Sequence, residues 1–461
     1  MVPYRDNRRW IKLGWFVGIL TFVTVNGIAS PTCYAQDNRL RILTDDAEAL
    51  QARIDLIQRA ENSIDVAYYS VDTDQVPVAL LELLRQASVR GVRVRILVDG
   101  LIFRVPAKFE KYLRRFGVNI RVYHQPHQGN LRWLNRRLHS KLIVVDDSVA
   151  IIGSRNLENE YYQFHHDRNF VDCDALVSGD VAKRAKVYFD RLWCTPDVSR
   201  APDHDSLRFD ALKYSPTDRT EWNLAWRHAK GPADYQQLLC RSLQQVTSHC
   251  NVRLNSNRDW MADSLHGVDV DLLHDCLTDK SKRIVQQRIV QLMDSARRSL
   301  LIESPYPAFD RPIRQAISRA RSRGVQVTLL TNSLRSTDQV NVYAAYQNQK
   351  RGLLKEGVQL REFSSNDILH AKTMIVDNRS CMLGSYNFDG RSDTLNLELC
   401  IVSNDPVVTN AVRDSVQTRL AKSTRIAAGR LWLSVGPEGT ASKRIRMALK
   451  RGVVELYRRS L

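Results

Sequence analysis

The chain lacks the cysteine spacing of small metal-binding or redox domains, and it has little glycine or proline. None of its eight cysteines forms a C-x-x-C pair, which disfavours zinc sites and dithiol redox motifs. After residue 29, no stretch is long and apolar enough to span a bilayer. With 20 glycines and 14 prolines in 461 residues, the composition is that of an ordinary globular protein. A chain of this length predicts two or three domains.

Acidic residues are outnumbered by basic ones, 50 against 68, so the formal net charge is +18 at pH 7. Such an excess favours anionic partners, which include nucleic acid, phospholipid headgroups and an acidic bilayer surface. Charge alone does not choose among them.

The cysteines leave two alternatives open. We interpret most of them as buried small hydrophobic residues. In an exported protein, Cys194, Cys240, Cys250 and Cys276 could instead form disulfide bridges, whose connectivity the sequence does not reveal.

Residues 1–35 are organised like an export signal. Basic residues within the first twelve positions precede an apolar run from Leu13 to Ala29, and a polar stretch follows. Cys33 and Ala35 are both small, which allows cleavage after residue 35. A retained membrane anchor and a merely apolar N-terminus are the alternatives. We therefore expect an exported or membrane-associated protein, on the periplasmic side or at the cell membrane.

Two halves of the chain share one order of predicted elements, in which strands alternate with helices. In the first half we expect strands over 63–71, 92–100, 141–147, 149–154 and 170–179, and helices over 76–91 and 180–193. In the second we expect strands over 298–306, 325–333, 371–377, 382–387 and 395–404, and helices over 313–324 and from 405 onward. This order predicts an α/β fold in which helices cover a central sheet in each half.

The same pattern gives the predicted domains. An N-terminal lobe covers 36–199 and a C-terminal lobe covers 286–425. Residues 200–285 lack the alternation and are interpreted as a linker or an inserted subdomain. In the basic tail, 426–461, apolar residues recur at helical spacing among lysines and arginines. That tail could lie on an anionic membrane, or it could dock on the body as an amphipathic helix.

The most informative feature is a motif that occurs twice. Residues 139–156 (HSKLIVVDDSVAIIGSRN) and 370–387 (HAKTMIVDNRSCMLGSYN) both fit H-x-K-x4-D-x6-G-S-x-N, and every fixed position is displaced by 231 residues. Six fixed letters recur by chance with odds of roughly one in 10^7 to 10^8. The duplication indicates one site built across an internal pseudo-two-fold, with one histidine from each half.

Spacing within the motif brings four kinds of side chain together. Positions i and i+2 of a strand share a face, so each histidine points with its lysine, and each serine points with its asparagine. The side chains concerned are His139, Lys141, Ser154 and Asn156 in the first half and His370, Lys372, Ser385 and Asn387 in the second. A phosphodiester suits this set.

In such a site, lysines, serines and asparagines can hold the phosphate oxygens, one imidazole can attack phosphorus, and the other can protonate the leaving oxygen. The two histidines could instead belong to a metal-binding site. It is disfavoured because each histidine is partnered by a lysine, and no carboxylate lies at ligand spacing.

Carboxylates are needed to orient the imidazoles and select their tautomers. Asp146 and Asp377 belong to the motif but lie on the opposite strand parity from the histidines, which favours a supporting role such as an ion pair or a turn. The best histidine-orienting candidate in the second half is Glu398. Its counterpart in the first half is Asp172 or Asp174, which the pattern does not separate.

At these residues the chain resembles the phospholipase D superfamily, whose signature is the paired H-x-K-x4-D motif. The resemblance covers nearly the whole chain after residue 35. It implies two α/β/α sandwich lobes that are related by a pseudo-two-fold and share one active site, with a phosphohistidine intermediate and no metal or other cofactor. It further implies that His139 is the nucleophile and His370 the acid and then the base, within a catalytic set that includes Lys141, Lys372 and the motif aspartates.

Finer matches resemble bacterial cardiolipin synthases, particularly the C type. RRLHSK, GSRNLENEYY and DCDALVSG are similar to that group's first half, and ESPYP, TNSLRSTD and LHAKTMIVD are similar to its second. The resemblance implies a phosphatidyltransferase that acts on phospholipids at an anionic membrane surface. Because one chain carries both halves, a monomer suffices for one site.

Other functions use the same machinery. With water as acceptor the enzyme would be a phospholipase D that releases phosphatidic acid. A metal-independent nuclease or other phosphodiesterase is a further alternative, although the export segment and the basic tail fit lipid better than nucleic acid. A catalytically inert membrane-binding protein is a third alternative, against which two intact motifs argue.

Overall fold

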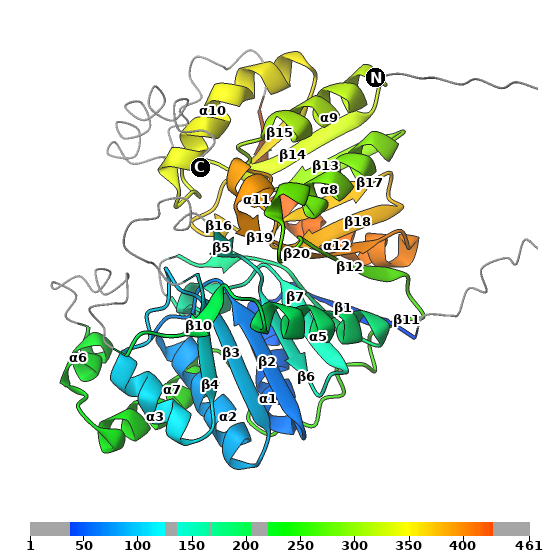
Figure 1. Ribbon diagram of the computed structural model, residues 1–461. Coiled ribbons are helices and arrows are strands. Elements are labelled where there is room, and N and C mark those ends of the chain that lie inside the picture. Colours follow the sequence, from blue (N-terminus) through cyan, green and yellow to red (C-terminus); the bar gives the residue numbers. More distant parts are fainter. Residues whose placement is uncertain (1–36, 125–135, 166–167, 204–219, 427–461) are drawn as a thin grey trace, which may run out of the picture. The chain divides into compact units, whose positions relative to one another are not determined.

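The computed structural model describes residues 37–124, 136–165, 168–203 and 220–426 (Figure 1). The predicted export segment and all of the basic tail after Ile426 lie outside these residues. Within the described ranges, no helix combines the length and the apolar character that a membrane crossing requires. The seven cysteines in these ranges are free thiols, and Cys173, Cys250, Cys381 and Cys400 are buried.

The first lobe is built on a mixed sheet with nine strands among the described residues. Their order is β10 (Val198–Arg200), β4 (Asn119–Tyr123), β3 (Arg93–Asp99), β2 (Ser63–Tyr68), β6 (Leu142–Val145), β7 (Val149–Gly153), β9 (Asp174–Ser178), β1 (Arg39–Leu43) and β11 (Leu265–His266). Neighbours β2, β3 and β4 are parallel, and the other pairs are antiparallel.

The second lobe repeats this order. Its described strands are β12 (Val270–His274), β20 (Leu399–Ser403), β18 (Ser380–Gly384), β17 (Thr373–Val376), β13 (Ser299–Glu303), β14 (Gln326–Asn332), β15 (Gln359–Phe363) and β21 (Ser423–Arg425). Again three strands that follow one another in the chain, β13, β14 and β15, are parallel, and the other pairs are antiparallel. The predicted α/β architecture with two related lobes is confirmed.

Helices lie on both faces of each sheet. Those of the first lobe are α1 (Asp46–Arg59), α2 (Gln75–Val89), α3 (Ala107–Arg115) and α5 (Asp180–Trp193). Those of the second are α8 (Ile284–Ser295), α9 (Arg311–Ser322), α10 (Val340–Lys355), the short α11 (Gly390–Thr394) and α12 (Pro406–Ala421). Their ends follow local rules: α12 starts with a proline, and the carboxylate of Asp405 accepts from Val407 N at 2.8 Å.

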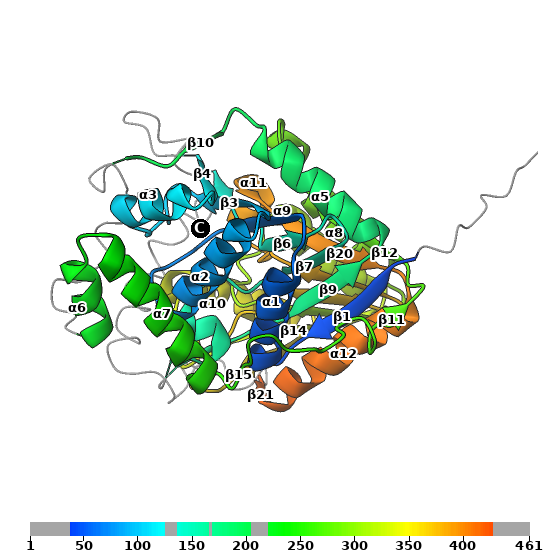
Figure 2. The ribbon, with the colours of Figure 1, turned by 90° about the horizontal axis from the view of Figure 1, so that it is seen from below.

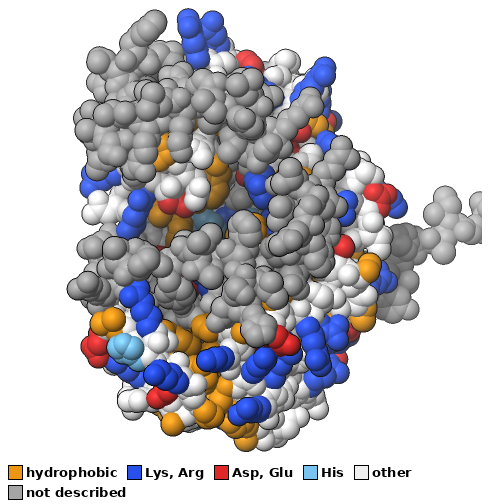
Figure 3. Space-filling model, turned by 60° about the vertical axis from the view of Figure 1, so that its left-hand side comes forward, with side chains coloured by type: hydrophobic (Ala, Val, Ile, Leu, Met, Phe, Trp, Pro, Cys, Tyr) orange, Lys and Arg blue, Asp and Glu red, His pale blue; other side chains and the backbone are white. Residues whose placement is uncertain are grey.

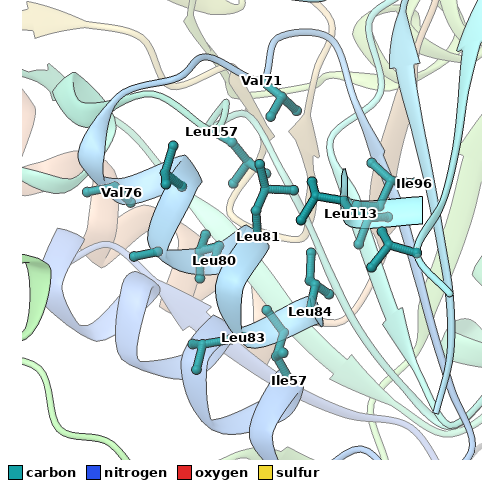
Figure 4. Close-up of a cluster of buried hydrophobic side chains, with 14 of the residues drawn as sticks. Ile57, Val71, Val76, Leu80, Leu81, Leu83, Leu84, Ile96, Leu113 and Leu157 are labelled. Atoms are coloured by element: carbon teal, nitrogen blue, oxygen red, sulfur yellow. The ribbon is translucent and has the colours of Figure 1, made fainter. Parts of the chain in front are cut away.

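Apolar stripes on the helices fill three main cores. In the first, Val76, Leu80 and Leu84 recur along one face of α2 and pack with Ile57 of α1 and Leu113 of α3 (Figure 4). The second lobe has an equivalent core between its sheet and α8, α9 and α10. Each fully buried leucine or isoleucine contributes about 1.5–3 kcal/mol relative to exposure.

The remaining core lies between the two lobes. It contains residues of both sheets and of helices α5 and α12. Helix α5 packs on its own sheet and also contacts β12 of the second, while α12 packs on the second sheet and contacts β1 of the first (Figure 2). The lobes therefore share an apolar interior and are not joined only by a linker.

Part of the predicted linker is described. Helix α6 (Glu221–His228) and helix α7 (Pro232–His249) contribute Trp226 and Leu239 to the first lobe's core, and α7 packs against α2. The chain then pairs through β11 with the first sheet and through β12 with the second. The domain boundaries given by the sequence stay predictions.

Candidate active site

Two short parallel strand pairs connect the lobes and place the motif histidines. Strand β5 (Arg137–Leu138) pairs with β19 (Asn396–Leu397), and β8 (Phe170–Val171) pairs with β16 (Ile368–Leu369). Each pair ends directly before a histidine on one strand and a carboxylate on the other. Backbone bonds continue the pairing, since His139 N donates to Leu397 O at 3.0 Å and His370 N donates to Val171 O at 2.9 Å.

The histidines and their carboxylates are therefore crossed between lobes. Nδ1 of His139 donates to Oε2 of Glu398 at 2.9 Å, and Nδ1 of His370 donates to Oδ2 of Asp172 at 2.7 Å. An ionised carboxylate can only accept, so the proton sits on Nδ1 and the lone pair on Nε2. The sequence identified these partners as candidates but contains no signal for the crossing.

Burial sets the protonation states of the pairs. It lowers the pKa of both His139 and His370 to about 4, although their carboxylate partners raise it. Burial alone would raise the pKa of Glu398, but His139 and Lys141 lower it to about 2, and the pKa of Asp172 is also strongly lowered by His370. At neutral pH both imidazoles are neutral and face ionised carboxylates.

The two lysines lie beside the histidines in an equally buried environment. Nζ of Lys141 donates to the carbonyl oxygen of His139 at 2.7 Å, and Nζ of Lys372 donates to that of His370. Burial and the charge of Lys372 lower the pKa of Lys141 to about 7, and burial lowers the pKa of Lys372 to about 8. Both lysines are 1% exposed, and Nζ of Lys372 also lies 3.0 Å from each ring nitrogen of His370.

The motif serines and asparagines occupy different places. The hydroxyl of Ser154 donates to Asp172, and that of Ser385 donates to Glu398, so both serines bind the histidine-orienting carboxylates. Asn156 and Asn387 instead line the cavity described below, and each has a buried Oδ1 without a hydrogen-bond partner among the described residues. Since an amide can rotate, each asparagine can present a donor or an acceptor to a ligand.

The motif aspartates lie away from the histidines, in the two hairpins that follow β6 and β17. Asp146 and Asp377 have left-handed backbone, with φ of 48° and 53°, as type I′ turns require. Each carboxylate accepts three backbone N–H groups at 2.7–3.0 Å where the first parallel strand of its lobe starts, at 61–63 and 297–299. The structure does not bring these two residues to the cavity.

Asp174 and Asp172 bind different partners. The carboxylate of Asp174 accepts from Arg53 at 2.8 Å and from Arg155 at 3.1 Å in a fully buried network. The lobes break their strands differently here, with Asp172 and Cys173 between β8 and β9 but only Glu398 between β19 and β20. The first lobe thus has one more residue at this point than the second, and for this reason the sequence repeat alone does not show whether Asp172 or Asp174 corresponds to Glu398.

The motif glycines allow this close packing. A Cβ on Gly153 would lie 1.9 Å from Oδ1 of Asp174, and one on Gly384 would lie 2.5 Å from Cα of Cys400. In both lobes the strand that carries the glycine therefore approaches the next strand too closely for any side chain.

A cavity of about 440 Å³ contains both histidines. In Figure 3 a hollow opens near the middle of the face, and a histidine is visible at its base. The wall residues that sequence reasoning did not select include the aromatic side chains Tyr69, Tyr161, Phe170 and Tyr306, the acids Glu158, Glu160, Asp338 and Asp389, and the bases Arg104 and Arg391. Glu158 and Asp389 could have been found, since they also are 231 residues apart.

Two further residues at strand ends hold the histidine strands. Oδ2 of Asp99, at the end of β3, accepts from Leu138 N at 2.8 Å. At the corresponding end of β14, Asn332 accepts from Leu369 N at 2.9 Å and donates to Leu369 O at 2.8 Å. Each thus fixes the residue that precedes a histidine.

Chemically, the site offers two neutral imidazoles with unprotonated Nε2 atoms, each paired with a carboxylate that can stabilise a positive charge. Nε2 of His370 lies 3.0 Å from Nζ of Lys372 and 3.4 Å from the hydroxyl of Tyr161. Asn156 and Asn387 line the same cavity with amide groups suited to phosphate oxygens, and the ammonium groups of Lys141 and Lys372 bond to the carbonyl oxygens of the two histidines. Among the described residues, no group of three His, Cys, Asp or Glu side chains is arranged to hold a metal ion.

Comparisons with known proteins agree with this geometry. Residues 53–193 and 289–420, more than half of the chain, match the family described as "Cardiolipin synthase, PLD-like domain". The chain is 28% identical over 436 residues to an uncharacterized protein of Helicobacter pylori, covering 86% of this chain and 82% of the relative. It is 29% identical over 397 residues to cardiolipin synthase C of Escherichia coli, covering 78% and 80%.

Among solved structures, the phosphatidylserine synthase of Haemophilus influenzae has a similar fold. The TM-score is 0.66 at 16% identity, and the alignment covers 93% of this chain and 98% of the other. At that identity the likeness concerns the fold alone.

Proposed function

Because the chain belongs to the cardiolipin synthase family of phospholipase D-like enzymes, we propose that it is a phosphatidyltransferase that moves a phosphatidyl group between phospholipids through a phosphohistidine. The observation that carries this proposal is the crossed arrangement, in which His139–Glu398 and His370–Asp172 both face one cavity. The relative named cardiolipin synthase C supports a phospholipid as both donor and acceptor.

In the first step, Nε2 of His139 attacks the donor phosphorus and the bond to the headgroup oxygen breaks. That oxygen takes a proton from His370, whose protonated form the bound phosphate anion favours. Glu398 stabilises the positive charge that forms on His139. Lys141 and Lys372 are close enough to this centre to offset the negative charge on the phosphate oxygens.

In the second step, the acceptor alcohol gives its proton to His370 and its oxygen attacks the phosphorus. The P–N bond breaks, and His139 returns to its neutral form. Water in place of the alcohol would give phosphatidic acid, so the same two steps also describe a phospholipase D. We propose that the enzyme works at an anionic membrane surface, to which the predicted export segment would deliver it.

The test uses the purified full-length chain with chelator and vesicles of phosphatidylglycerol or phosphatidylethanolamine, and separately DNA, with products identified by mass spectrometry. Cardiolipin formation is the expected result. Phosphatidic acid as the only lipid product would identify the enzyme as a hydrolase instead of a transferase. DNA fragments without lipid products would overturn the assignment of a lipid substrate.

Three variants assign the roles. His139→Ala and His370→Ala should both abolish turnover, whereas His266→Ala, at an exposed histidine of β11, should retain it. A labelled phosphatidyl adduct trapped in His370→Ala but not in His139→Ala would identify His139 as the nucleophile. The opposite pattern would exchange the two roles.

A further inference from the structure

The repeat continues beyond the motif, and there its two copies differ in charge. Two residues after each motif asparagine, both lobes have an acid on the cavity wall, Glu158 and Asp389. Two residues further on, the first lobe has Glu160 and the second has Arg391, and both line the cavity. The phosphate-handling groups are duplicated, but the groups around them are not.

The surroundings of the two histidines also differ. His370 is surrounded by three aromatic rings, with ring centroids 5.1 Å away for Tyr161 and Phe170 and 6.1 Å for Tyr306. Within the part of the chain that the structure describes, His139 has one such neighbour, Tyr69, at 5.1 Å. The position that corresponds to Phe170, two residues before the carboxylate, is the polar Asn396 in the second lobe.

Two carboxylates, those of Asp338 and Glu160, line the same cavity as these rings. Asp338 accepts from the hydroxyl of Tyr306 at 2.6 Å and lines the same cavity. Glu160 directly precedes Tyr161, whose hydroxyl lies 3.4 Å from Nε2 of His370. The buried Oε2 of Glu160 has no hydrogen-bond partner among the described residues.

A third acceptor lines the same cavity. Asn156 is 6% exposed, its Nδ2 donates to the hydroxyl of Tyr161 at 3.0 Å, and its Oδ1 has no partner among the described residues. Buried acceptors without partners favour a ligand that brings hydrogen-bond donors. Carboxylates also disfavour a neighbouring phosphate anion, so we expect the phosphate to lie near the lysines and the alcohol part of the substrate to lie toward Glu160 and Asp338.

We propose that Glu160, assisted by Asp338, determines headgroup specificity by binding a second hydrogen-bond donor, a hydroxyl or an ammonium group, on the alcohol that leaves or enters at His370. Tyr161 and Phe170 stack on each other, with ring centroids 4.5 Å apart, and form an aromatic wall of the cavity against which the carbon atoms of that alcohol or an ammonium group would pack. This inference rests on the proposed function and deepens it, because it says which alcohols the enzyme prefers.

The experiment measures transfer from phosphatidylglycerol vesicles to three soluble alcohols at equal concentration: deuterated glycerol, ethanolamine and 1-propanol. Mass spectrometry separates the three phosphatidyl products. Glycerol offers extra hydroxyls, ethanolamine offers an ammonium group, and 1-propanol offers no second donor. We expect the wild type to prefer glycerol or ethanolamine to 1-propanol by at least tenfold.

Glu160→Gln should reduce that preference about tenfold or more, and Asp338→Asn should reduce it less, because Asp338 is already bonded to Tyr306. A loss confined to ethanolamine identifies an ammonium ligand, and a loss with both alcohols identifies a general donor site. Arg391→Gln is the matched variant at the repeat-related position, and it should not reduce the preference. A thermal unfolding midpoint for each variant checks that it is folded.

Three outcomes overturn the inference. They are a wild type without preference for glycerol or ethanolamine over 1-propanol, a preference unchanged in Glu160→Gln, and an equal loss in Arg391→Gln. In each of these, formation of phosphatidylpropanol still supports the proposed function. If the wild type transfers to no alcohol at all, the proposed function fails, and the inference fails with it.

Discussion

Replacing Glu398 by glutamine removes one charge from the centre of the site with almost no change in shape. Glu398 is fully buried and accepts from His139 at 2.9 Å, from Asn396 at 3.2 Å and from the hydroxyl of Ser385. A hydrogen bond to a charged group contributes about 1.5–3 kcal/mol. Since each 1.36 kcal/mol is tenfold in rate, we expect kcat/KM for phosphatidyl transfer to fall by about 10- to 150-fold.

A second effect of Glu398→Gln concerns Lys141. Burial and Lys372 lower the pKa of Lys141 to about 7, and Glu398 opposes them by raising that pKa. Without that carboxylate the pKa falls further, so the alkaline limb of the kcat/KM–pH profile should move to lower pH. A merely structural role for Glu398 would not produce this displacement.

The assay is transfer from phosphatidylglycerol to deuterated glycerol between pH 4 and 9, with Glu221→Gln on the exposed face of α6 as the control. Urea denaturation shows how much stability the variant loses. A Glu398→Gln enzyme within threefold of wild type across this range would refute the assigned role of the crossed carboxylate.

Three further predictions concern the framework. Gly384→Ala would place a Cβ 2.5 Å from Cα of Cys400, and it should lower the free energy of unfolding by about 1–3 kcal/mol in urea denaturation. Asn332→Ala leaves Leu369 N and O without their partner, so transfer activity should fall about tenfold or more while circular dichroism shows an intact fold. Burial raises the pKa of Asp377, but three backbone N–H groups outweigh it and hold the pKa below its usual value, so the stabilising contribution of Asp377 is present above the unfolded pKa of about 3.9 and is lost as pH falls through the folded pKa. Asp377→Asn should therefore be less stable than wild type at pH 7 and approach it near pH 2, as thermal unfolding at the two pH values would show.

Much of the fold follows from local patterns. Helix α5 has the predicted bounds 180–193, and the strands predicted over 63–71 and 325–333 contain β2 and β14, which are mostly buried central strands. Such elements are specified by periodicity and by their own caps, which a sequence displays directly.

The crossing of the carboxylates could not be predicted in this way. It depends on β5 pairing with β19 and β8 with β16, each only two residues long, and such short pairs carry no periodicity. Likewise, the motif serines were predicted to hold phosphate, but their hydroxyls bind Asp172 and Glu398. Strand parity gives the face of a side chain and not its partner.

The crossed pairs have a consequence for how this chain can change over generations. A histidine and the carboxylate that orients it are encoded more than 190 residues apart, one in each half of the gene. A change at either one must be matched in the other half, so the two halves cannot drift independently even though each forms its own sheet. Recombination that exchanges one half for that of a distant relative keeps the pairs only if the incoming half supplies the matching histidine and carboxylate. The active site can therefore be inherited intact only as the whole two-lobed chain.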